Sequence, residues 1–106
     1  MAKLLALLQT RIEQVHKCDA VHSESVFVHE TLGGDTIWQG YVEVFDLYGH
    51  AEAKKCYAWP CDPDSEVMEF VTILEKSPVD SPAMAVKAAI FFDAQPVQHH
   101  RHVLAE

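Results

Sequence analysis

The chain has 106 residues, and its 16 acidic and 8 basic side chains give a formal net charge of −8 at pH 7. Its length fits one domain and excludes a two-domain enzyme, and an apolar content of 49% excludes a chain that is disordered throughout. Nucleic-acid binding needs clustered cations, and the only adjacent basic pair is Lys54-Lys55. We therefore expect a small acidic domain with no nucleic-acid partner.

The apolar run at residues 1–8 is followed at once by polar side chains, so it is too short for a secretory signal or a membrane span. No later segment is long and apolar enough for a span, so no membrane partner is expected. The three cysteines form no framework pattern, which favours a reduced, cytoplasmic chain. Pairing of Cys56 with Cys61 stays open, because their Cα atoms approach within the ~7 Å of a disulfide only through a tight turn at Pro60.

The first predicted element is an amphipathic helix near residues 2–17. Its apolar positions recur at spacings of four, four and three: Leu4, Leu8, Ile12 and Val15. Residues 25–31 are rich in β-branched and aromatic types and predict a strand, and Gly33-Gly34-Asp35 predicts the turn of a hairpin. The returning strand should cover residues 36–47.

The strand over 36–47 is apolar on both faces, which is unusual for an antiparallel strand with one face in water. A second surface must cover the additional face, and the candidates are the chain's own loops, a ligand or a second copy of the chain. Gly40, in the middle of this strand, indicates a bulge or a close approach by another backbone.

Further along the chain, residues 56–59 predict a short strand, and residues 67–75 predict another that is apolar on both faces. Ser81 as N-cap and Pro82 at the first helical position predict a helix to about residue 94. This helix is apolar on nearly every side, so it should be buried on more than one side.

These elements predict an α+β fold with the order α-β-β-β-β-α. We expect a two-layer sandwich, in which a mainly antiparallel sheet of about four strands carries the N-terminal and the C-terminal helix on one face. Residues 1–96 should form a single domain, and residues 97–106 should form a frayed C-terminal tail.

No standard motif for a nucleophile, a phosphate loop or a redox pair is present. The best candidates for acid/base chemistry are Glu43, on an apolar strand face, and His50, just beyond the end of that strand. The competing interpretation is that Glu43 lies in water at an edge position, and it is the one we favour. No catalytic residue is therefore assigned.

Large aromatic side chains on neighbouring segments form a second group. Such rings serve in cores, at protein interfaces and in ligand pockets alike, and all three interpretations stay open. The candidate ligand or interface residues are Trp38, Tyr41, Phe45, Tyr57 and Trp59.

Metal binding is not expected. The tail histidines His99, His100 and His102 lack the spacing of a structural zinc site. The acidic residues Asp62, Asp64 and Glu66 lack the glycine of a calcium loop. We accordingly expect neither a metal nor another cofactor.

Two hypotheses for function follow. The first is a small binding or interaction domain without catalytic activity, homodimeric through the second sheet face or the apolar C-terminal helix. The second is a small acid/base enzyme, or a protein that binds a small apolar ligand in an aromatic-lined pocket. Substrate, ligand and partner cannot be identified from the residues.

Overall fold

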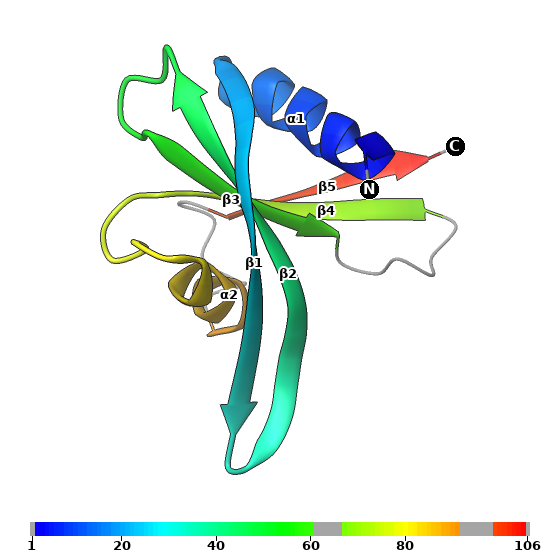
Figure 1. Cartoon of the computed structure of the whole chain (residues 1–106), viewed down its shortest axis with the longest axis vertical. Helices are drawn as coiled ribbons and strands as arrows, with labels where there is room; N and C mark the ends of the chain where they lie inside the picture. The colour runs from blue at the N-terminus through cyan, green and yellow to red at the C-terminus, as the bar shows by residue number, and fades with distance from the viewer. Residues whose placement is uncertain (1, 61–66, 92–98, 106) are drawn as a thin grey trace.

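The computed structural model describes residues 2–60, 67–91 and 99–105. The helix α1 (Ala2–His16) precedes the strands β1 (Asp19–Leu32), β2 (Asp35–Tyr48), β3 (Lys55–Pro60) and β4 (Val67–Leu74). The helix α2 (Pro82–Phe91) and the strand β5 (His99–Ala105) follow them. Neighbouring strands are antiparallel and lie in sequence order, with β1 and β5 at the two edges of the sheet (Figure 1). The predicted α+β class and the order of its first six elements are confirmed.

The two helices lie on opposite sides of the sheet, which corrects the expectation that both cover one face (Figure 1). Alternate residues of each central strand belong to different cores. On β2, Phe45 packs with Leu8 of α1, whereas Val44 packs with Val86 of α2. Strands β3 and β4 alternate in the same way. The fold therefore has three layers, and each face of the central strands is covered by the chain's own helix.

The segment predicted as a frayed tail contains β5, and this is the second difference from the expected fold. Residues 99–105 pair with Val67 to Ile73 of β4. Three histidines and an arginine interrupt any hydrophobic pattern that would predict this strand. The backbone groups on the free edge of β4 nevertheless need hydrogen-bond partners, whatever side chains the partner strand carries. Residues 97, 98 and 106 of the predicted tail lie outside the described residues.

Local signals that depend on backbone geometry are confirmed. Gly33 and Gly34 both have positive φ, as the two-residue turn between Leu32 and Asp35 requires. The hydroxyl of Ser81 accepts the backbone N–H of Met84 at 3.2 Å, which is the N-cap contact of α2. Helix α2 is described only to Phe91, so the predicted end near residue 94 lies outside the described residues.

Gly40 marks a close approach by a side chain. It pairs in register with Val28, and a Cβ atom at this position would come within 3.3 Å of the Trp38 ring. The Trp38 ring in turn packs edge-on against Trp59, with ring centroids 5.6 Å apart, in the α2 core. The expected bulge or backbone approach is therefore replaced by an indole ring lying over the strand.

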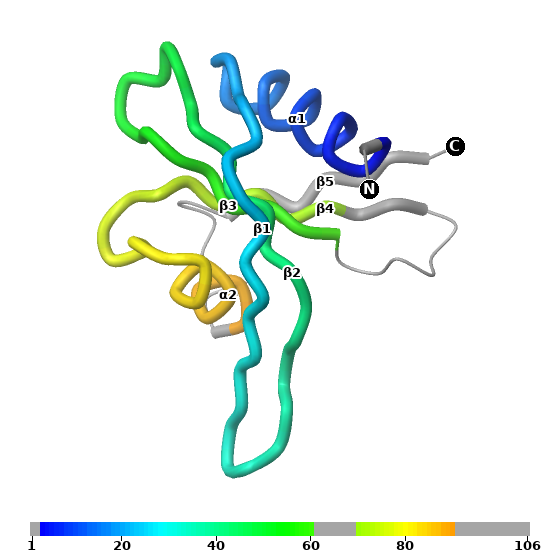
Figure 2. Tube along the Cα trace, viewed as in Figure 1, coloured from blue at the N-terminus to red at the C-terminus, as the bar shows by residue number. Residues whose placement is uncertain are grey.

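Strands β1 and β2 form a hairpin of two 14-residue strands that extends well beyond both helices (Figure 2). Helix α1 lies beside the open end of this hairpin and α2 beside its middle, on opposite faces, and the turn end extends past both helices (Figure 1). Each face of the hairpin is consequently covered over only part of its length. This partial cover is what exposes the surfaces described below.

The aromatic residues of β2 allow a test of the two cores. Phe45 is fully buried, whereas Tyr48 is 57% exposed. We expect Phe45→Ala to lower the free energy of unfolding by about 3–5 kcal/mol, through lost burial and a residual cavity. Tyr48→Ala, the control on the same strand, should change it by about 0.5 kcal/mol or less. Urea denaturation followed by circular dichroism measures both, and equal effects would contradict the core assignment.

Candidate functional site

Glu43 is the buried carboxylate of the sheet, with a relative exposure of 2%. It lies on the central strand β2, between Ser25 of β1 and Ala58 of β3, on the face that α1 covers further along. The prediction that it lies in water at an edge position is therefore wrong. A buried carboxylate without partners costs several kcal/mol, so its partners determine whether it is tolerated.

Two side chains of β1 supply those partners. The Oε1 atom of Glu43 lies 2.9 Å from Nε2 of His22 and accepts a hydrogen bond from the hydroxyl of Ser25. The His22 side chain is 28% exposed, and its ring packs edge-on against Phe45 with centroids 5.3 Å apart. The three polar groups form a cluster, His22–Ser25–Glu43, that is buried at the carboxylate and open at the imidazole and the hydroxyl.

A β-bulge brings this cluster together. His22 and Ser25 are three positions apart, so in a regular strand their side chains would point to opposite faces. The register shifts between His22, opposite Phe45, and Glu24, opposite Val44, and this shift leaves Ser23 unpaired. The extra residue turns His22 to the same face as Ser25, and both reach Glu43.

The cluster orients the imidazole. When Glu43 is ionised its oxygens only accept hydrogen bonds, and Nε2 of His22 then donates to Oε1 while Nδ1 of a neutral ring is left as an acceptor. A histidine oriented by a carboxylate is the arrangement that acid/base catalysis uses. Sequence reasoning missed His22 and Ser25, because residues three positions apart point to opposite faces of a regular strand and nothing in the composition indicates the bulge.

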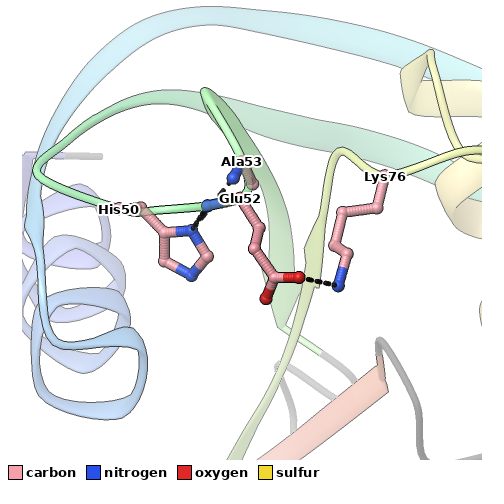
Figure 3. A network of polar contacts seen from close by, with 4 residues as sticks. All are labelled: His50, Glu52, Ala53 and Lys76. Atoms are coloured by element: carbon pink, nitrogen blue, oxygen red, sulfur yellow. Dashed lines mark hydrogen bonds and ion pairs between the residues drawn. The ribbon is translucent and has the colours of Figure 1, made fainter.

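The structure does not bring His50 into this cluster. His50 follows β2, and its Nδ1 atom accepts the backbone N–H groups of Glu52 and Ala53 at 3.1 and 3.0 Å (Figure 3). Glu52 in turn forms an ion pair with Lys76 at 3.5 Å. The Nδ1 atom of His50 thus serves to close a turn. Glu43 lies five residues before Tyr48, the last residue of β2, and these five residues of extended strand span roughly 17 Å between Glu43 and the loop that carries His50.

Four of the five predicted aromatic residues belong to the cores. Phe45, Tyr57 and Trp59 are buried, and Trp38 is half-buried against Trp59. The hydroxyl of Tyr57 donates a hydrogen bond to Glu75 at 2.9 Å. Burial raises the pKa of the phenol, and the hydrogen bond to Glu75 raises it further. Tyr41 alone is widely exposed, at 58%.

Tyr41 belongs to an exposed surface that we call the hairpin face. Phe27 lies opposite Tyr41 in the register, is 55% exposed and contacts it edge-on at 5.4 Å between ring centroids. The surface is on the same side of the sheet as Glu43, on the part of the hairpin that α1 does not cover. The hairpin face comprises Ser25, Phe27, His29, Thr36, Gln39 and Tyr41.

Among the described residues, no group of three or more histidine, cysteine, aspartate or glutamate side chains is placed to hold a metal ion. The acidic residues Asp62, Asp64 and Glu66 lie outside the described residues. So do the side chains of the tail histidines, whose backbone forms part of β5. Of the described helices, none is long and apolar enough to cross a membrane.

Comparison with protein-family models, with curated proteins and with solved structures finds no match to this chain.

The coupling within the cluster is measurable by a double-mutant cycle with His22→Phe and Glu43→Gln. Because the imidazole and the buried carboxylate satisfy each other, we expect an interaction energy of about 1–3 kcal/mol in the free energy of unfolding at pH 7. Urea denaturation of the wild type, both single variants and the double variant provides it. Strictly additive effects would show that the contact contributes nothing.

Cys56 provides a second test, of the buried α1 core. Cys18 and Cys56 are both free, and Cys61 lies outside the described residues. Burial raises the pKa of the Cys56 thiol far above its usual value, so ionisation is confined to the unfolded chain. The contribution of the protonated Cys56 thiol to the free energy of unfolding is therefore at its maximum below about pH 8.5. Above that pH it declines by about 1.4 kcal/mol per pH unit. Cys56→Ala should make the decline between pH 8 and pH 10 shallower, and an unchanged slope would contradict this assignment.

Proposed function

We propose that this protein is a small homodimeric interaction domain without catalytic activity of its own, and that two copies meet through the hairpin face. The supporting observation is an exposed aromatic pair, Phe27 and Tyr41, on a surface that no element of the described chain covers. Aromatic side chains are enriched at the centres of protein interfaces because they bury large areas at a low entropic cost.

The distribution of charge supports a second copy as the partner. A chain with a net charge of −8 repels its own copies wherever acidic surfaces meet. On the hairpin between residues 24 and 43, Glu24 and Glu30 point to the opposite face and Asp35 lies at the turn. Glu43 is on the same side as the hairpin face but is buried beneath its two partners. The hairpin face thus exposes no charged carboxylate, and two acidic copies meet there with little repulsion.

The paired aromatic side chains also suit a symmetric contact. In a two-fold dimer the same patch serves both copies, so the Phe27–Tyr41 pair of one copy packs on the pair of the other. Such packing buries four aromatic rings at the centre of the contact. The free thiols of Cys18 and Cys56 support the cytoplasm as the compartment in which the dimer acts.

A second candidate function rests on the His22–Ser25–Glu43 cluster. A buried carboxylate that orients a partly exposed imidazole is an arrangement suited to proton transfer, or to binding a small ligand over Phe27 and Tyr41. This alternative replaces the predicted pocket of core aromatics and replaces His50 by His22. It requires a small molecule to occupy the surface that the first proposal gives to a second copy.

Native mass spectrometry of the purified chain distinguishes the two candidates. We expect twice the mass of one chain with no added mass, and Tyr41→Glu should reduce it to one chain because a charge enters the centre of the contact. The matched control is Tyr48→Glu, which changes an equally exposed tyrosine at the far end of β2 and should leave the dimer intact.

Other masses would overturn the homodimer. A single chain that carries additional mass would favour the ligand-binding alternative. A wild-type monomer without added mass, or a dimer that survives Tyr41→Glu, would reject the hairpin face as the contact between copies.

A further inference from the structure

His29 is the histidine of the exposed hairpin face. It lies opposite Gln39 in the register, two positions beyond Phe27, and its ring is exposed. Its Nε2 atom lies 2.7 Å from the hydroxyl of Thr36. A hydroxyl accepts from an imidazole or donates to it, so this contact holds the ring in place in the neutral form.

No negative charge faces His29 on the described part of this surface. From β2 the ring is near the uncharged side chains of Thr36 and Gln39. The titratable side chains of that strand nearest in register are Tyr41, on the same face, and Asp35, which pairs with Leu32 at the turn and points to the opposite face. On its own strand, Glu24 and Glu30 point to the opposite face, where Glu30 meets Lys87 of α2 at 3.7 Å. Helix α1 covers the other end of the sheet (Figure 1).

The other histidine of this side, His22, differs in its surroundings. Protonation of His22 places a positive charge directly against the buried carboxylate of Glu43, so the two charges cancel locally. Protonation of His29 creates a positive charge beside uncharged groups. Protonation thus leaves the His22–Glu43 pair with no net charge, whereas it leaves an uncompensated positive charge at His29.

We propose that His29 is a pH sensor that dissociates the homodimer in mildly acidic solution. The inference rests on the proposed function, since it requires two copies to meet through the hairpin face. In a two-fold dimer both His29 rings enter one contact, and histidine is the side chain that commonly gains a charge in mildly acidic solution. The neutral rings are compatible with the contact, whereas two protonated rings repel each other and lose hydration.

The test is the dimer dissociation constant at pH 7.5 and pH 5.5, measured by light scattering after size-exclusion chromatography over a concentration series. Proton uptake by two rings raises this constant by up to about a hundredfold at one pH unit below their pKa, and we expect at least about tenfold for the wild type. His29→Gln keeps a polar side chain without a titratable proton and should remain dimeric at both pH values. The matched control His22→Gln should remain pH-sensitive.

Each outcome decides between the two proposals. A wild type that is monomeric at pH 7.5 rejects the homodimer and the sensor with it. A dimer with the same dissociation constant at both pH values rejects only the sensor, as does acid dissociation that persists in His29→Gln. Circular dichroism at pH 5.5 establishes that the dissociated chains are folded, and a loss of the folded signal would overturn the sensor as well.

Discussion

The central strands bury side chains on both faces, and the rest of the structure depends on this constraint. Phe45 and Cys56 belong to one core, and their chain neighbours Val44 and Tyr57 belong to the other. A strand of this kind requires cover on each face, and the described residues form two helices that provide it. One helix per face is the arrangement that leaves neither side of the central strands in water.

Covering the centre in this way leaves one face of the long hairpin uncovered wherever no helix lies on it. Phe27 and Tyr41, near the middle of their strands, are exposed on the side of α1, and Val21 and Tyr48, near the open end of the hairpin, are exposed on the side of α2. The exposed apolar side chains of the hairpin thus lie where neither helix covers it.

Much of the fold was predictable, because periodicity and turn chemistry are local properties. The helix over 2–17, the Gly33-Gly34 turn and the Ser81 cap each depend on a few adjacent residues, and the structure agrees with them. The sides taken by the helices were not predictable from such signals, because only three-dimensional packing decides which face a helix covers. The strand β5 was missed because backbone pairing, which any side chain permits, creates it.

The candidate site was predictable only in part. Glu43 was identified from its apolar surroundings, but its partners depend on a register shift that adjacent residues do not announce. His50 was selected for its position behind a glycine, and that position serves a turn. Tyr41 was selected with four other aromatic residues, and only the paired register with Phe27 distinguishes it from them.

The bulge at Ser23 divides β1 into two segments whose side-chain alternation is out of phase by one residue. Ala20 and His22 keep the phase that serves the α1 core, while Val26 and Val28 keep the phase that serves the α2 core. One strand can therefore contribute to two cores without a break in its pairing. Deletion of Ser23 would turn the side chains of one segment to the opposite face of the sheet. The number of residues in β1 is therefore as strictly constrained as the identity of a buried side chain.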